Sequence, residues 1–192
     1  MDNKIFNDIG LEFNNTFYNR CDQYIALLKQ WGTIHNLTAE LETLKIEANI
    51  VDSIYPLKFV NDFTSLADIG TGAGYPGMLL AIARPEVKVT LIEPRRKRVA
   101  FLNFVKNALS LNNVEIICDR VENVKDKSFD LITSRAVTNT SLLMDLTNDI
   151  SDDNTEFLFY KGSMCESEIQ EASLKAYEVI NVKDRNYLYI KK

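Results

Sequence analysis

Histidine is almost missing from this chain of 192 residues, because His35 is the single one. The three cysteines, Cys21, Cys118 and Cys165, lie far apart and form no Cys-x-x-Cys motif. A metal site built from several histidines is therefore excluded, and we expect no metal centre. An odd number of scattered cysteines favours free thiols in a reducing compartment over a disulfide framework.

Long apolar stretches are missing as well. No apolar run approaches the roughly 18 residues that a membrane span needs, and the residues from Met1 to Lys4 do not resemble a signal peptide. We therefore expect a cytoplasmic protein without a membrane segment. The 22 basic and 27 acidic residues give a net charge of −5, which argues against a general nucleic-acid-binding protein. Any contact with nucleic acid must come from a local basic patch.

Two patterns divide the chain. In residues 4–31 and 40–60, apolar side chains recur at three- and four-residue spacing, which predicts two helices joined by a turn at Gly32–Thr38. Pro56 is expected to kink or end the second helix. From about residue 63, short apolar runs alternate with helical stretches. The prediction is a helical N-terminal cap, residues 1–62, followed by an α/β domain, residues 63–192.

The second pattern predicts a mostly parallel sheet with helices on both faces, because helical stretches separate most of its strands. Two last apolar runs, 177–182 and 186–190, enclose a short turn at Asp184–Arg185 and favour an antiparallel hairpin at the end of the sheet. The other strands are expected at 65–69, 87–93, 113–118, 129–133 and 155–160, and the helices at 77–84, 95–110, 138–149 and 165–175.

A glycine-rich stretch is the most informative part of the chain. It runs from Asp68 to Gly77 as Asp-Ile-Gly-Thr-Gly-Ala-Gly-Tyr-Pro-Gly, after a predicted strand and before a predicted helix. Glycines let a backbone turn sharply and approach a ligand closely, and the amides at the start of a helix then face that ligand. This stretch therefore predicts a ligand-binding loop.

Two classes of ligand fit the loop. The spacing Gly72-x-Gly74-x-x-Gly77 matches the dinucleotide fingerprint, with Glu93 about 20 residues later at the end of the next strand. The same loop, read as Asp-x-Gly-x-Gly-x-Gly from Asp68, resembles the first motif of class I S-adenosylmethionine-dependent methyltransferases. The carboxylate of Glu93 suits either ligand, because it can accept two hydrogen bonds from a ribose diol.

An NAD-dependent oxidoreductase is therefore the alternative function at this point. Its further chemistry would need a Tyr–Lys pair, and Tyr187-x-x-x-Lys191 has the spacing that short-chain dehydrogenases use. These two residues lie in a predicted strand, where side chains four positions apart are distant from each other. A nucleotide-binding regulatory module without catalysis is a third reading.

Several further blocks of sequence narrow the methyltransferase reading. They are Asn36-Leu37-Thr38 after Trp31, Asp52-Ser53, Gly74-Tyr75-Pro76-Gly77, Leu91-Ile92-Glu93 with Lys97-Arg98 and Phe101-Leu102, Arg120-Val121-Glu122, Ser134-Arg135-Ala136 and Lys161-Gly162. In this order, from about Leu27 to about Glu168, the chain resembles the RsmG (GidB) family of bacterial 16S rRNA methyltransferases. The resemblance implies a Rossmann-like fold with an antiparallel terminal strand and S-adenosylmethionine as the cofactor. It also implies a monomer that methylates N7 of guanine 527 (bacterial rRNA numbering) in 16S rRNA of the small ribosomal subunit.

The resemblance also implies roles for individual residues. Arg135 should face the methionine end of the cofactor or the incoming base, which makes it the implied catalytic residue. Glu93 should hold the ribose hydroxyls, and Val121 and Glu122 should flank the adenine. The implied cofactor-binding residues are Asp68, Gly70, Gly72, Gly74, Tyr75, Glu93, Val121, Glu122 and Arg135.

Two positions depart from the family pattern. The family usually has histidine three residues before the Asp-Ser pair, where this chain has Asn49. It usually has asparagine directly after the tryptophan, where this chain has Gly32. Both positions lie in the predicted cap, so the departures concern substrate contacts more than cofactor binding.

The composition is compatible with methylation of a ring nitrogen. Guanine N7 carries an in-plane lone pair and no proton, so its attack on a sulfonium methyl group needs alignment more than a general base. The Asn/Asp-Pro-Pro-Tyr motif, used to methylate exocyclic amines, does not occur in the chain. No Pro-Cys dipeptide occurs either, which argues against a cysteine nucleophile acting on pyrimidine C5.

One dense basic run stands at residues 95–98, Arg-Arg-Lys-Arg, where a helix is predicted to begin. Cations are unfavourable at that end of a helix dipole, which suggests binding of phosphate. Arg95 and Arg98 are three positions apart and share one side of the helix. We therefore expect Arg95 and Arg98, together with Asn36 of the cap, to contact RNA.

Overall fold

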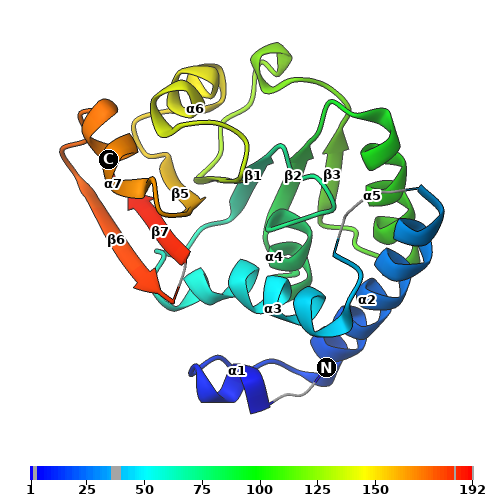
Figure 1. Cartoon of the computed structure of the whole chain (residues 1–192). Coiled ribbons are helices and arrows are strands. Elements are labelled where there is room, and N and C mark those ends of the chain that lie inside the picture. The colour runs from blue at the N-terminus through cyan, green and yellow to red at the C-terminus, as the bar shows by residue number, and fades with distance from the viewer. Residues whose placement is uncertain (2–3, 36–39, 184, 192) are drawn as a thin grey trace.

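The computed structural model describes the chain except residues 2–3, 36–39, 184 and 192 and the side chains of residues 34 and 35. Its elements form a mixed α/β fold (Figure 1). The helices are α1 (Lys4–Asp8), α2 (Asn15–His35), α3 (Thr43–Ile54), α4 (Gly77–Ala83), α5 (Arg96–Ala108), α6 (Thr140–Leu146) and α7 (Cys165–Glu171), with 3-10 turns at Tyr55–Lys58, Val121–Asn123 and Asn148–Ile150. The strands are β1 (Ser65–Ile69), β2 (Lys88–Ile92), β3 (Val114–Ile117), β4 (Leu131–Arg135), β5 (Glu156–Lys161), β6 (Tyr177–Val182) and β7 (Arg185–Ile190).

The seven strands form one sheet in the order β3-β2-β1-β4-β5-β7-β6. The first five strands run parallel, and β7 pairs antiparallel with both β5 and β6. From β1 the chain moves outward to β2 and β3, then returns to place β4 on the other side of β1. In open α/β sheets, ligands bind beyond the carboxyl ends of the strands at such a switch point. The fold therefore places a site where β1 and β4 end.

Both faces of the sheet are covered, as the sequence predicts. In β1, Leu66 packs into the hydrophobic cluster that also contains residues of α2, α3, α4 and α5. Its neighbours Ala67 and Ile69 pack into a second cluster with residues of α6 and α7. This alternation follows from the two-residue period of a strand. The N-terminal helices therefore share one continuous core with the sheet.

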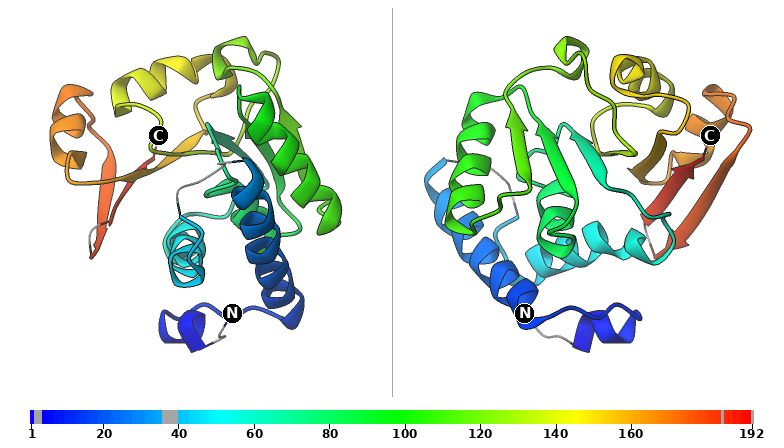
Figure 2. Two further views of the ribbon diagram at one scale, coloured as in Figure 1. Left: turned by 45° about the vertical axis from the view of Figure 1, so that its right-hand side comes forward. Right: turned by 180° about the vertical axis from the view of Figure 1, so that it is seen from behind.

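The N-terminal helices differ from the sequence prediction. A single helix over residues 4–31 is wrong, because α1 ends at Asp8 and Gly10 takes a left-handed conformation at φ +75°. A new helix begins after Asn14, whose side-chain oxygen accepts a hydrogen bond from the amide of Phe17 at 3.0 Å. Figure 2 shows α1 apart from the sheet, with α2 running alongside α5.

Several boundaries differ as well, and the strand predicted at 129–133 and the helices predicted at 138–149 and 165–175 are Leu131–Arg135, Thr140–Leu146 and Cys165–Glu171. The helix α2 continues through Gly32 to His35, where the sequence predicts a turn, and residues 36–39 lie outside the described part of the chain. The helix predicted at 40–60 spans only Thr43–Ile54, and Pro56 stands at the start of a 3-10 turn, since proline has no amide hydrogen to continue the helix. At the terminal hairpin, Arg185 belongs to β7 and not to the turn.

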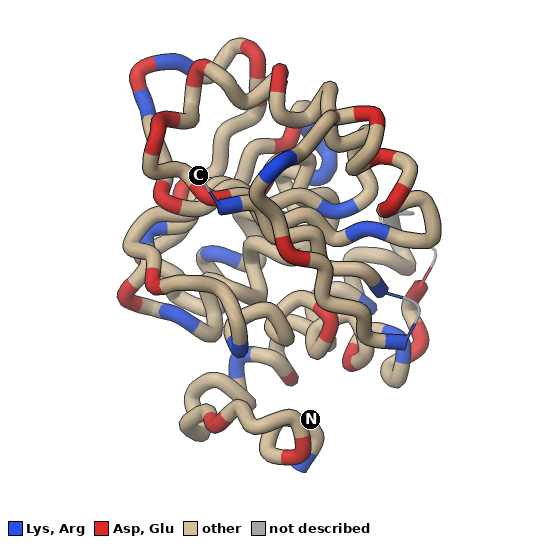
Figure 3. Tube along the Cα trace, turned by 90° about the vertical axis from the view of Figure 1, so that its left-hand side faces the viewer, with Lys and Arg blue, Asp and Glu red and all other residues tan. Residues whose placement is uncertain are grey.

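Among the described residues, no helix combines the length and apolar character that crossing a membrane requires. Acidic and basic positions are interspersed along the trace (Figure 3), in keeping with a net charge of −5 shared among 49 charged side chains, 22 basic plus 27 acidic.

Candidate active site

The glycine-rich loop joins the end of β1 to the start of α4. Gly70, Gly72 and Gly74 have φ values of +67°, +61° and +103°, which residues with a Cβ atom adopt only at a cost. The amide of Gly70 donates to the carbonyl oxygen of Ile92 at 2.8 Å, which ties the loop to the end of β2. The sequence prediction of a sharply turned loop between a strand and a helix is confirmed.

Asp68 lies under this loop and is fully buried. Its Oδ2 accepts a hydrogen bond from the amide of Gly77 at 2.8 Å, at the first residue of α4. A Cβ atom on Gly77 would stand only 2.6 Å from the Cβ atom of Asp68, so glycine allows this close approach. Burial raises the pKa of Asp68 to about 7, although the Thr71 hydroxyl, the Gly77 amide and the charge of Arg135 oppose the shift.

Glu93 follows β2 directly and is 1 % exposed. Its Oε2 accepts a hydrogen bond from the amide of Gly72 at 3.0 Å, and its Oε1 accepts one from the amide of Arg95 at 2.9 Å. The guanidinium of Arg98 lies 3.4 Å from Oε2. Because each carboxylate oxygen has two lone pairs, Oε1, which has one donor, keeps a position for a further donor such as a ribose hydroxyl, whereas Oε2 already faces both the Gly72 amide and Arg98.

A cavity of about 500 Å³ opens beside this carboxylate. Its volume lies within the range of small-molecule sites. Six residues that the sequence analysis singles out line it: Gly70, Glu93, Arg95, Arg98, Val121 and Glu122. The remaining lining residues are Ile69, Ile92, Pro94, Arg120, Ala136, Val137 and Leu146.

The loop after β4 forms one wall of the cavity. Ala136 has φ +56°, an uncommon value for a residue with a Cβ atom, and Val137 follows it. A Cβ atom on Gly70 would stand 2.5 Å from Cγ2 of Val137, so the loops after β1 and β4 touch only because residue 70 is glycine. The wall therefore comes from the two strands that flank the switch point.

Arg135 ends β4 and lies outside the lining of that cavity. Its guanidinium carbon stands 4.6 Å from the centre of the Tyr75 ring. Its Nη1 donates to Oδ1 of Asn49 at 2.8 Å and to Oδ2 of Asp52 at 3.1 Å. Arg135 thus joins helix α3 to the glycine loop, and one of the two positions that depart from the family pattern, Asn49, contacts it directly.

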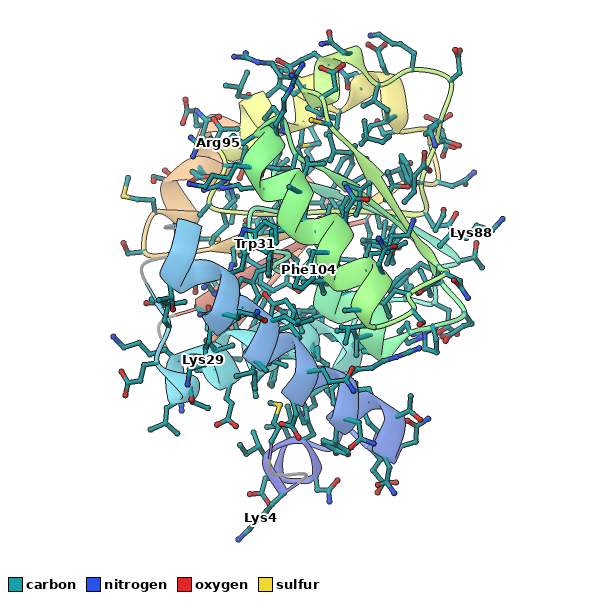
Figure 4. All side chains as sticks on the ribbon, turned by 90° about the vertical axis from the view of Figure 1, so that its right-hand side faces the viewer. Lys4, Lys29, Trp31, Lys88, Arg95 and Phe104 are labelled. Atoms are coloured by element: carbon teal, nitrogen blue, oxygen red, sulfur yellow. The ribbon has the colours of Figure 1, made fainter. Side chains whose placement is uncertain are left out.

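The basic run lies as the sequence predicts, with Arg95 as the N-cap residue of α5. Figure 4 shows Arg95 at this end of α5, and Trp31 beside Phe104 between α2 and α5. Arg95 is exposed, whereas Arg98 is partly buried against Glu93. Asn36, the third residue expected to contact RNA, lies outside the described residues.

Sequence reasoning missed several residues of this region. Ala136 stands in one of the blocks that resemble the RsmG family but was given no role, and Val137 carries no signal beyond its place after a strand. Arg185 and Tyr187, which contact Asp52, come from a terminal strand in which the sequence shows only an apolar pattern. Asp52 itself belongs to one of the blocks that resemble the RsmG family, and that was the available signal.

The residues present fit an adenosine-containing cofactor with an amino-acid tail. The cavity offers a buried carboxylate for a diol and the apolar side chain of Val121 for a ring. Within the described part of the chain, three buried oxygen atoms of the glycine loop make no hydrogen bond of good geometry: Oδ1 of Asp68, Oγ1 of Thr71 and the hydroxyl of Tyr75. The Thr71 hydroxyl still lies near enough to the Asp68 carboxyl to lower its pKa. Buried polar atoms in native sites are normally paired more closely than this, so the loop has polar atoms available for a bound ligand.

The sheet order bears on the oxidoreductase alternative. Dinucleotide-binding domains of the doubly wound type have six parallel strands in the order 3-2-1-4-5-6. Here an antiparallel β7 is inserted between β5 and β6. This arrangement fits the methyltransferase reading and does not fit the oxidoreductase alternative.

Comparison with known proteins gives the same result. Residues 18–191 match the GidB family, described as rRNA small subunit methyltransferase G. The chain is 57% identical over 188 residues to ribosomal RNA small subunit methyltransferase G of Aliarcobacter butzleri, covering 98% of this chain and 97% of that protein.

Solved structures support the fold. A methyltransferase from Geobacter sulfurreducens aligns with a TM-score of 0.63 at 14% identity, covering 100% of this chain and 96% of the other. TYW2 of M. jannaschii in complex with AdoMet aligns with a TM-score of 0.56 at 18% identity, covering 79% and 78%. The chain belongs to the GidB family, the rRNA small subunit methyltransferases G, and is an S-adenosylmethionine-dependent methyltransferase.

Proposed function

We propose that this enzyme methylates N7 of guanine 527 (bacterial rRNA numbering) in 16S rRNA of the small ribosomal subunit. The observation that carries the proposal is the 57% identity, over almost the whole of both chains, to a ribosomal RNA small subunit methyltransferase G. S-adenosylmethionine supplies a methyl group attached to a positively charged sulfur. Guanine N7 has a free lone pair, so the protein must align the two reactants and need not remove a proton.

The surroundings of Arg135 agree with that chemistry. The described side chains that contact its guanidinium are the Tyr75 ring, the Asn49 amide and the Asp52 carboxylate. Burial raises the pKa of Tyr75 to about 12, so its phenol stays protonated at neutral pH. Tyr75 is therefore no general base there, and a nucleophile that carries no proton does not need one.

We propose that the cofactor extends from the cavity to the glycine loop. Glu93 holds the ribose hydroxyls, Val121 and Glu122 flank the adenine, and Gly70 gives the backbone room to pass close to the ligand. The amino-acid end lies beside Asp68, with Tyr75 and Arg135 at the methyl group. Gly72 and Gly74 complete the loop, and Gly72 also orients the Glu93 carboxylate through its amide.

We propose that RNA contacts the rim of the cavity through Arg95 and Arg98. Both arginines line the cavity; Arg95 is the N-cap residue of α5 and Arg98 lies in its first turn. Arg98 stands 3.4 Å from Glu93, but a guanidinium has five N–H groups and keeps several of them for a phosphate. We further propose that the enzyme is a monomer and acts in the cytoplasm, where rRNA is modified.

Transfer of a labelled methyl group tests the proposed function. Small subunits and free 16S rRNA from cells that lack this methyltransferase would be incubated with the enzyme and labelled S-adenosylmethionine. We expect one modified nucleotide per subunit, mapped by chemical cleavage at N7-methylguanine to guanine 527. Label at another nucleotide, or no label in either substrate, would overturn the proposal. Using both substrates shows which of them is accepted.

The proposed monomer is tested separately by light scattering on the purified enzyme. We expect a mass near 21.9 kDa for the single chain. A mass near twice that value, unchanged on dilution, would contradict it.

A further inference from the structure

Helix α3 brings one carboxylate to the carboxyl edge of the sheet. Asp52 contacts Arg135 through Oδ2, at 3.1 Å from Nη1. Its other oxygen, Oδ1, accepts from Nε of Arg185 at 2.8 Å and from the hydroxyl of Tyr187 at 3.0 Å. Three side chains from β4 and β7 therefore meet on a single residue of the N-terminal helical segment.

We propose that Asp52 is a positioning residue for methyl transfer, which holds the guanidinium of Arg135 over the glycine loop. The proposal rests on the proposed function, because it assigns Arg135 to the methyl end of the cofactor. Arg135 links Asp52 to the loop, because its guanidinium contacts both Asp52 and the ring of Tyr75 in the loop. The role is therefore one of orientation and charge.

Several contacts fix the place of Asp52. The hydroxyl of Tyr160 donates to the carbonyl oxygen of Ser53 at 2.6 Å, which ties this turn of α3 to β5. The hydroxyl of Tyr187 also lies 3.3 Å from the carbonyl oxygen of Asp52 itself. Burial and the Asp52 charge raise the pKa of Tyr187 well above its usual range, so Tyr187 remains a hydrogen-bond donor. The carboxylate is thus held from two strands.

Arg135 is in turn held on three sides. Asp52 and Asn49, one helical turn apart on α3, both accept hydrogen bonds from its Nη1, and the ring of Tyr75 lies against the guanidinium. The side chains of Asp52 and Arg135 are each only 16% exposed. A buried ion pair with ideal partners is rigid, and rigidity of this kind is what alignment of two reactants requires.

The balance of charge leaves this group positive. Two guanidinium groups, of Arg135 and Arg185, share the single carboxylate of Asp52, so the group carries one net positive charge. The contacts use Nη1 of Arg135 and Nε and Nη1 of Arg185, so several N–H groups remain. The arrangement keeps a cation beside the glycine loop while it prevents the arginine from swinging into solvent.

A purely structural role for Asp52 is the competing explanation. Asp52 also links α3 to the sheet, so its loss would destabilise the fold even if Arg135 had no task. Asp130 offers a matched comparison, because its carboxylate also joins separate elements, through the amides of Thr64 and Ser65 and the hydroxyl of Thr64. Asp130 precedes β4, at the end of the strand opposite to Arg135.

The experiment compares Asp52→Asn with Asp130→Asn and the wild-type enzyme. Single-turnover methyl transfer to small subunits gives the rate of the chemical step, and calorimetry gives the affinity for S-adenosylhomocysteine. For Asp52→Asn we expect a loss in rate of roughly tenfold to a hundredfold, the scale of a misplaced reactive group. The affinity for S-adenosylhomocysteine should fall much less than the rate, because this ligand lacks the methyl group at which Arg135 is proposed to act.

RNA affinity gives a readout that a structural role would not produce. Asp52→Asn removes a negative charge between two arginines. Small subunits should therefore bind to this variant as tightly as to the wild-type enzyme or more tightly, while the rate of methyl transfer falls. Tyr187→Phe keeps both ion pairs and removes one hydrogen bond to Oδ1, so its rate should lie between those of wild type and Asp52→Asn. Asp130→Asn should lower the melting temperature and leave the rate per folded molecule unchanged.

Other outcomes overturn the proposal in distinguishable ways. If Asp52→Asn and Asp130→Asn lower the rate only in proportion to the unfolded fraction, Asp52 is a structural link. If Asp52→Asn is too unstable to study, an unchanged rate in Tyr187→Phe overturns the proposal, and a reduced rate supports it. If wild-type enzyme transfers a methyl group neither to small subunits nor to free 16S rRNA, the proposed function fails first.

Discussion

Replacing Glu93 by alanine should separate two tasks of one carboxylate. The side chain is 1 % exposed and accepts hydrogen bonds from the amides of Gly72 and Arg95. Without it the partly buried Gly72 amide loses its partner, at a cost of about 1–3 kcal/mol in stability, while water can reach the amide of the exposed Arg95. The proposed bond to the ribose is charge-assisted and contributes about 1.5–3 kcal/mol, so its loss weakens cofactor binding roughly 10- to 150-fold.

The assay is titration calorimetry with S-adenosylhomocysteine, paired with thermal melting of the enzyme without ligand. Glu115→Ala is the matched control, because Glu115 is an exposed carboxylate on the neighbouring strand β3, paired with Lys127. It should leave the affinity unchanged. A loss of less than about twofold for a folded Glu93→Ala would refute the reasoning, since even one neutral hydrogen bond contributes more. A lower melting temperature with unchanged affinity would assign Glu93 to the loop alone.

Three further predictions concern the same region. Gly77→Ala places a Cβ atom 2.6 Å from the Cβ atom of Asp68 and 2.5 Å from Cδ2 of Leu91. It should therefore destabilise the enzyme by about 1–3 kcal/mol, measured by urea unfolding. An unfolding curve like that of the wild-type enzyme would contradict this close packing. Burial raises the pKa of Asp68 from 3.8 to about 7, so the unfolded chain releases this proton at lower pH than the folded enzyme does. The free energy of unfolding should therefore fall as the pH rises from about 4 to about 7, and should level off above about pH 7. Asp68→Asn should remove that part of the pH dependence, and parallel stability curves for the two proteins would count against the shift. The double variant Arg95→Ala and Arg98→Ala should reduce the slope of log K for RNA binding against log salt concentration by roughly 0.7–0.9 per lost phosphate contact. Lys97→Ala is the control, because Lys97 lies on the same turn but outside the cavity lining, and it should leave the slope unchanged. Equal slopes for all variants would show that the arginines are only solvated.

The sheet was predictable from sequence because its signals are local. Each strand is a short apolar run bounded by polar or turn residues, and helical stretches between the runs imply parallel pairing. The break between α1 and α2 was not predictable in the same way, since the apolar spacing continues across it. Only the left-handed Gly10 and the capping side chain of Asn14 show where the helix stops and restarts.

In the candidate site, too, the residues with a local sequence signal were predictable and the others were not. The glycine loop and Glu93 were found because their spacing in the sequence is itself the signal, and the structure brings Gly72 and Glu93 to 3.0 Å. Asp52 and Arg185 are 133 positions apart, and no spacing rule connects them. The left-handed conformation of Ala136 was equally invisible, because alanine has no preference for it.

The contacts of Asp52 change the interpretation of the N-terminal helices. From sequence, residues 1–62 are predicted to form a cap whose departures from the family pattern, Asn49 and Gly32, concern substrate contacts more than cofactor binding. In the structure Asn49 and Asp52 both hold Arg135, and the hydroxyl of Tyr24 on α2 donates to the carbonyl oxygen of Ala73 in the glycine loop at 2.9 Å. Helices α2 and α3 therefore support the walls of the site from outside. A histidine at position 49 would also have a ring nitrogen available as an acceptor, so asparagine keeps the contact with Arg135 and removes a titrating group.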